Sequence, residues 1–244
     1  MPLLLKMKKR KTMMRLDPLK KIFAAAAAVC VVSLAVMPVL AEETTTEADD
    51  NTFTDNVMTY RKAEGGVYIS DCESNTSSVD ISGEVDGYKV IGIDANAFSD
   101  CTKLTEINLP DTITDIGESA FAGCTSLKKA NIPGGMTKVP DKIFALCSAL
   151  REVDIPESVT EIGEYAFSYC DDLTWFEVPE TITAIGNYAF AYSNMGETLE
   201  IPEGVESIGA LSFYYCQGLK TAKLPSTLES IGTLAFLGCN DLSA

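Results

Sequence analysis

The apolar positions of this chain recur at a fixed step of 23 residues. Phenylalanine keeps this step without insertion or deletion at Phe98, Phe121, Phe144, Phe167, Phe190, Phe213 and Phe236. Proline keeps it at Pro110, Pro133, Pro156, Pro179, Pro202 and Pro225, and cysteine follows a phenylalanine by three residues at Cys101, Cys124, Cys147, Cys170, Cys216 and Cys239. Ser193 holds the one remaining cysteine place. A fixed step of about 20–50 residues indicates a solenoid, whose stacked coils bury a continuous core.

Each coil predicts two extended segments. In one example, Leu150, Val153 and Ile155 follow the pattern L-x-x-L-x-L, and the alternation at its end is typical of a half-buried strand. Pro156 cannot donate a ladder hydrogen bond and therefore ends this strand. Residues 159–162 alternate again and predict a second, shorter extended segment.

A bend and a short helical turn complete the predicted coil. Gly163 permits the bend that follows the second segment. Ala166, Phe167 and Cys170 fit one helical or 3₁₀ turn with its apolar side inward. The predicted fold is a mainly β solenoid with short helical turns, about seven coils long, over residues 93–244.

The repeated motif is similar to that of a known family. The pattern I-G-x-x-A-F-x-x-C-x-x-L-x-x-I-x-I-P-x-x-V-T resembles the BspA-type leucine-rich repeat, with copies in register from about Val67 to Ala244. The resemblance implies a leucine-rich repeat solenoid. It also implies a secreted or surface protein of bacteria, in a family implicated in adhesion to host matrix proteins or other cells.

The two ends of the solenoid differ in sequence. Residues 58–92 predict an N-terminal cap, because two apolar segments flank the turn residues Glu64, Gly65 and Gly66 of a β-hairpin. At the other end the chain stops as an eighth strand is due to begin. We expect weak self-association through this uncapped coil, since open strand edges pair with other chains.

The first 57 residues read as an export signal followed by a linker. Basic residues, an uncharged stretch over residues 22–40 and a small residue at Ala41 predict a signal peptide over residues 1–41. An uncleaved membrane anchor is the alternative reading of this stretch. Residues 42–57 are acidic and threonine-rich and predict a disordered linker. We therefore expect a secreted or cell-surface protein with no membrane span after cleavage.

Composition narrows the function. The chain has no histidine, which removes histidine bases and imidazole metal ligands. It has 35 Asp and Glu against 19 Lys and Arg, a net charge of −16, so a phosphate backbone is repelled and nucleic acid is not an expected partner. A solenoid offers a long surface and seldom a deep pocket, and no residues are singled out as catalytic.

The cysteine column admits metal, disulfide and redox interpretations. Tetrahedral zinc prefers short paired spacings such as C-x-x-C, which this chain lacks. Parallel stacked side chains point the same way and suit disulfides poorly. Because Ser193 takes one place in the column, we expect buried thiols packed on backbone turns, with no metal and no cofactor. Cys72, outside the column in a polar loop, is the predicted reactive thiol.

The outward positions of the longer strands are the candidate binding residues. They carry charges of both signs, whereas the turns are mainly acidic, and Trp175 is the only tryptophan of the chain. Tryptophan and arginine are favoured as interface anchors. The candidate site is Lys129, Asn131, Arg151, Glu152, Asp154, Trp175, Glu177, Glu200 and Lys223.

These features favour a non-catalytic, adhesion-type module that binds a host or microbial surface protein or a glycan outside the cell. Ordinary solvated surface is the plainer reading of the same residues. Two other functions compete with binding: a structural, self-assembling fragment of a longer surface solenoid, and an accessory binding domain of a secreted enzyme.

Overall fold

The computed structural model describes residues 51–55, 57–174 and 176–243. The chain divides into two units, residues 1–45 and 46–244, and every described residue belongs to the second. The signal peptide predicted for residues 1–41 and the candidate anchor Trp175 therefore lie outside the described residues. Within the described ranges, no helix is long and apolar enough to cross a membrane.

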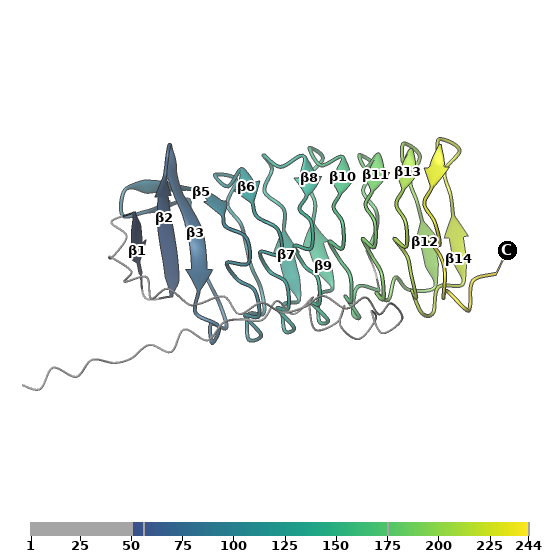
Figure 1. Ribbon diagram of the computed structural model, residues 1–244, viewed down its shortest axis with the longest axis horizontal. Coiled ribbons are helices and arrows are strands. Elements are labelled where there is room, and N and C mark those ends of the chain that lie inside the picture. Colours follow the sequence, from purple (N-terminus) through teal and green to yellow (C-terminus); the bar gives the residue numbers. More distant parts are fainter. Residues whose placement is uncertain (1–50, 56, 175, 244) are drawn as a thin grey trace, which may run out of the picture. The chain divides into compact units, whose positions relative to one another are not determined.

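Successive coils stack in parallel and are joined on one side by a sheet that we call the continuous sheet (Figure 1). Its five short strands pair in chain order and in one register, so each residue lies beside the residue 23 positions later. They are β8 (Lys138–Val139), β10 (Glu161–Ile162), β11 (Ala184–Ile185), β13 (Ser207–Ile208) and β15 (Ser230–Ile231). The predicted solenoid, its step and its parallel stacking are confirmed.

The longer strands form a second side, which we call the strand face. Here β7 (Lys129–Asn131) pairs with β9 (Glu152–Asp154), and β12 (Thr198–Glu200) pairs with β14 (Thr221–Lys223). On this side of the coils, Figure 1 draws no strand between β9 and β12. On the other side of the same coils, β10 and β11 remain paired in the continuous sheet. The strand face is therefore interrupted where the continuous sheet is not.

The predicted helical turn is wrong in its hydrogen bonding, because the described residues contain no helix. Tyr165 and Tyr169 have φ of 54° and 59°, in the left-handed region. Their amides, and that of Phe167, donate to Asn187, Ala191 and Ala189 of the next coil at 2.8–3.0 Å. Because the left-handed residues change the direction of the chain, every second amide points out of its coil. In a helix these amides would donate within the same segment, whereas here they donate to the next coil. Ala166, Phe167 and Cys170 still face inward and are fully buried.

Gly163 also has a different role from the predicted one. It lacks a left-handed φ, so the bend does not depend on its backbone freedom. A Cβ placed on it would lie 2.5 Å from the carbonyl oxygen of Val139 and 2.8 Å from the amide nitrogen of Asp141 in the preceding coil. Glycine is needed here because two backbones approach closely.

The core is a column of stacked phenylalanine rings. Six of the seven are fully buried, from Phe98 to Phe213, and Phe236 in the last described coil is half-buried. Neighbouring ring centroids lie 4.9–5.8 Å apart with interplanar angles of 3–25°. Each of the first six repeats thus buries one aromatic ring, its bulkiest fully buried side chain, against the ring of the next coil.

The cysteine column forms a hydrogen-bond ladder between coils. The thiols of Cys124, Cys147, Cys170, Cys216 and Cys239 each donate to the carbonyl oxygen of the phenylalanine in the preceding coil, at 3.1–3.3 Å. Ser193 makes the same bond to Phe167 at 2.5 Å. Burial raises the pKa of the Cys170 thiol well above its usual value, so it stays protonated as a donor. The prediction of thiols packed on backbone turns is confirmed.

Cys72 is not the exposed thiol that the sequence predicts. It ends β3 (Gly66–Cys72), is 1% exposed and belongs to the apolar core. A reactive cysteine needs access to solvent, and burial denies this to Cys72.

The first described strands cover the start of the coil stack. β2 (Met58–Ala63) and β3 form the predicted antiparallel hairpin around Gly65, and β3 then pairs in parallel with β5 (Tyr88–Ile93). β4 (Glu84–Val85) pairs antiparallel with β5. β6 (Asp115–Ile116) pairs in parallel with β5 and so connects these strands to the coils that follow.

One part of the predicted linker is ordered. β1 (Thr52–Thr54) pairs with β2, which corrects the prediction of disorder for these three residues. The cause is Phe53, whose ring stacks on Tyr60 at 5.1 Å and provides apolar burial that the threonine-rich composition obscures.

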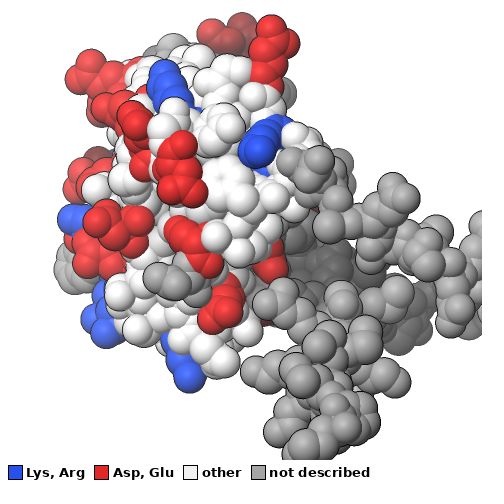
Figure 2. Space-filling view, turned by 90° about the vertical axis from the view of Figure 1, so that its left-hand side faces the viewer, with Lys and Arg blue, Asp and Glu red and all other residues white. Residues whose placement is uncertain are grey.

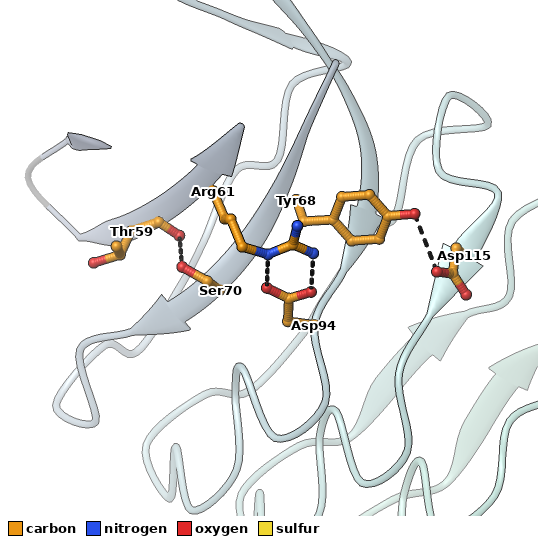
Figure 3. Close-up of polar contacts among 6 residues, drawn as sticks. All are labelled: Thr59, Arg61, Tyr68, Ser70, Asp94 and Asp115. Carbon is orange, nitrogen blue, oxygen red and sulfur yellow. Dashed lines mark hydrogen bonds and ion pairs between the residues drawn. The ribbon is translucent and has the colours of Figure 1, made fainter. Parts of the chain in front are cut away.

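Polar contacts clamp these strands to the first coils (Figure 3). Arg61 donates from Nε and Nη2 to both carboxylate oxygens of Asp94, at 2.9 and 2.6 Å, and its Cζ lies 4.7 Å from the ring centre of Tyr68. The Tyr68 hydroxyl donates to Asp115 at 3.1 Å. Figure 2 looks onto this end and shows acidic side chains over its left-hand and central parts, fewer basic ones, and uncharged surface between them.

Candidate functional site

Most of the charged residues predicted to bind lie on the strand face as ion pairs between neighbouring coils. Lys129 Nζ lies 2.8 Å from Glu152 Oε1 and 3.9 Å from Asp154 Oδ2. Lys223 pairs with Glu200 in the same way across β14 and β12. Because all five side chains are substantially exposed, each pair contributes little to stability, about 0–1 kcal/mol.

Arg151 forms a further ion pair between neighbouring coils. Its guanidinium donates from Nε and Nη2 to Asp172 Oδ2 at 3.1 and 2.7 Å, while the side chain remains 64% exposed. A partner that offers a better carboxylate can displace such a pair at small cost.

Asn131 has a structural role that the sequence does not reveal. Its amide accepts from the Leu109 amide at 2.6 Å and donates to the Leu109 carbonyl at 2.8 Å. A side chain therefore takes the place of one backbone hydrogen bond between these two coils, which keep others such as that from the Ile107 amide to the Lys129 carbonyl.

The interruption of the strand face can be followed bond by bond. The amides of Ile132 and Ile201 donate to Asp154 and Lys223 of the next coil at 2.8 and 3.0 Å. The equivalent bonds from Ile155 to Glu177 and from Val178 to Glu200 are absent among the described residues. Among the described residues, the strand segment of the coil that contains Phe176 therefore lacks this hydrogen bond both to the preceding coil and to the following one.

Phe176 stands at the centre of this interruption. It occupies the inward strand position that Ala130, Val153, Leu199 and Ala222 hold in other coils. Its ring is wedged between Phe167 and Phe190, with centroids 5.1 and 5.3 Å away and tilts of 46° and 50°. Its amide donates to Leu173 of its own coil at 3.4 Å instead of to the next coil. A bulkier ring thus takes the space that a paired strand would need.

Two grooves open on the strand face beside the unpaired segment. The first has a volume of about 670 Å³ and is lined by the apolar residues Phe176, Val178, Ile201 and Leu224 together with four glutamates. The second, of about 730 Å³, is lined by Thr174, Phe176, Met195 and Lys220 among others. Glu177 and Thr198 line both grooves, so the two lie on either side of these residues.

The grooves coincide with part of the predicted site. Glu177, Glu200 and Lys223 line them, whereas Lys129, Asn131, Arg151, Glu152 and Asp154 lie on earlier coils. Trp175 lies outside the described residues, between Thr174 and Phe176, which both line the second groove. Sequence reasoning missed Phe176 and Leu224, although the only phenylalanine at an inward strand position was a readable signal.

Comparison with known proteins fits this architecture. The model of the BspA type leucine-rich repeat region matches residues 71–196 and 194–244, in six copies. The chain belongs to this family. No protein with a curated description matches it.

Two solved structures show the same leucine-rich repeat fold. The leucine-rich repeat protein of T. pallidum is 27% identical with a TM-score of 0.67, over 78% of this chain and 90% of that chain. A leucine-rich repeat protein from Bacteroides ovatus is 28% identical with a TM-score of 0.62, over 75% of this chain. This chain covers 56% of the Bacteroides ovatus chain.

The leucine-rich repeat coils also carry stacked tyrosines on their turns. Tyr165 stacks on Tyr188 at 4.5 Å and Tyr169 on Tyr192 at 4.6 Å, with interplanar angles of 7° and 12°. Burial raises the pKa of Tyr192 to about 12. Because the rings cover one another's faces, they pack coil against coil.

Proposed function

We propose that this leucine-rich repeat protein is a non-catalytic binding module that acts outside the cell and holds a protein or glycan ligand on its strand face. The observation that carries the proposal is the pair of grooves beside the unpaired segment of residues 173–178. Both grooves are lined by apolar and polar side chains together, as recognition surfaces commonly are.

Export is part of the proposal. Its support is the basic, apolar and small-residue order of residues 1–41 together with the family's implied occurrence among secreted and surface proteins. Mass spectrometry of protein recovered outside the cell should find the mature N-terminus at Glu42. A product that keeps residues 22–41 would contradict the signal peptide.

A binding array tests the ligand site. The purified solenoid is applied to immobilised matrix proteins and glycans, and any hit is measured again with Trp175→Ala. A hot-spot aromatic should cost about 2 kcal/mol or more of binding free energy. Glu161→Ala, on the continuous sheet, is the control and should change little. Equal losses from both variants, with unchanged circular dichroism, would remove the strand face as the site.

Self-assembly is a second candidate with its own observation. Four exposed apolar side chains gather on the last described coils: Leu224 (45%), Ile231 (49%), Leu234 (52%) and Leu237 (47%). Open strand edges with apolar flanks favour pairing with another chain. Sedimentation over a concentration series should show weak association that Leu224→Lys reduces, and a strictly monomeric protein would contradict it.

A further inference from the structure

The edge of β12 that faces the Phe176 coil has free backbone groups. On the other side, toward β14, the Glu197 carbonyl accepts from the Thr221 amide and the Ile201 amide donates to the Lys223 carbonyl, both at 3.0 Å. The backbone N–H and C=O groups of successive residues point to opposite sides of a strand. Those of Leu199 therefore also point toward β14, whereas those of Thr198 and Glu200 point toward the coil that contains Phe176. No described residue hydrogen-bonds to the main chain of Thr198 or Glu200 on that side.

The grooves lie along this same edge. Thr198 lines both of them, and Glu200 lines the first. The coil on the far side is prevented from closing the ladder by Phe176, as described above. An unpaired strand edge, neighbouring apolar side chains and open volume therefore occur together, which is the combination that strand addition requires.

The charges around the edge specify the partner. Lys220 and Lys223 are already paired with Glu197 and Glu200. Within the described residues, the carboxylates of Glu177, Glu180 and Glu203 line the grooves without a basic partner. The field over the edge is therefore negative and complements a cationic segment.

We infer that the edge of β12 receives an extended, lysine- or arginine-bearing segment of a partner protein as an added strand. Main-chain hydrogen bonds to Thr198 and Glu200 hold the segment, alternate apolar side chains enter the grooves, and basic side chains meet Glu177, Glu180 and Glu203. The inference rests on the proposed function and deepens it, because it selects a protein ligand over a glycan.

Model peptides test the chemistry of the segment. Fluorescently labelled acetyl-Lys-Val-Lys-Val-Lys-Val-amide is titrated with the mature protein, and the glutamate counterpart replaces every lysine. The lysine peptide should bind, and the glutamate peptide should bind at least about tenfold more weakly. Equal affinity for the two peptides, or no binding of the lysine peptide, would overturn the inference.

N-methylated peptides test strand addition itself. One version is methylated at the lysine amides and the other at the valine amides, and only one of these sets faces β12 in an added strand. One version should therefore lose about tenfold or more in affinity while the other keeps it. Equal effects of the two methylations would overturn the strand geometry.

Location is tested by a matched pair and by hydrogen exchange. Glu177→Gln should weaken the lysine peptide about threefold or more, whereas Glu161→Gln makes the same change on the continuous sheet and should not. Bound peptide should slow exchange at Thr198 and Glu200 but leave Leu199, already in the ladder, unchanged. If the array ligand needs Trp175 while the lysine peptide fails these tests, the inference falls and the proposed function stands.

Discussion

The two sides of the same coils behave differently. On the continuous sheet, five strands pair without a break from β8 to β15, whereas on the strand face the described residues form no paired strand between β9 and β12. The glycines and thiols that fix the spacing of the coils lie away from the strand face, as do the stacked turns. One side of the solenoid therefore sets the register, which leaves the other free to vary in pairing and to form grooves.

The largest expected effect comes from the core that both sides share. Phe167→Ala should lower the free energy of unfolding by about 3–5 kcal/mol, because it removes a fully buried ring from between three others. Urea unfolding followed by circular dichroism measures the loss. Tyr169→Ala, at a half-buried stacked ring on the turns, should cost less, and the reverse order would mean that the turns rather than the core hold the coils together.

A smaller effect should follow from disturbing the continuous sheet. Gly163→Ala places a Cβ about 2.5 Å from the Val139 carbonyl oxygen, and overpacking of this kind typically costs about 1–3 kcal/mol. Gly135→Ala is the matched control, since its Cβ would lie 3.5 Å from the nearest atom, Thr114 Cγ2, in ordinary contact. Equal melting temperatures for the two variants would contradict the view that close backbone approach sets the coil spacing.

The interruption of the strand face should respond to a single side chain. Phe176→Val restores the size found at Val153 in the preceding coil, so Val178 is expected to regain its ladder bond to Glu200. Hydrogen exchange at the Val178 amide should then slow by about tenfold, as one added hydrogen bond allows. Leu199 provides the control amide. If Val178 exchanges as fast as in the unchanged protein, Phe176 is not the cause of the interruption.

The sequence predicted what repeats and missed what departs from repetition. The columns of phenylalanine and cysteine determine the solenoid, because each residue type recurs at a place that only burial explains. Left-handed tyrosines such as Tyr165 could not be read, since a tyrosine carries no sign of a positive φ and the stacked coil imposes it. Phe176 was missed for another reason: it preserves the apolar alternation, and only its size among the inward strand residues signals the missing hydrogen bonds.

The smallest change in the free energy of unfolding is expected at the cysteine column, where Ser193 already shows that serine can replace cysteine. Ser193 occupies a thiol place, donates to the Phe167 carbonyl at 2.5 Å and accepts from the Cys170 amide at 3.0 Å. Cys170→Ser should therefore keep the bond to Phe144 and cost less than about 1.5 kcal/mol, mainly for burying a more polar group.

Removing the donor at the same place should cost more than replacing it. Cys170→Ala removes the thiol donor to the Phe144 carbonyl, which still accepts from the Cys147 amide at 3.1 Å, and should cost about 0.5–1.5 kcal/mol for the hydrogen bond in addition to the lost packing of the buried sulfur. The two variants are compared by urea unfolding. If serine is as costly as alanine, packing volume and not the hydrogen-bond ladder explains the column, and the link between neighbouring coils would lie in the phenylalanine stack alone.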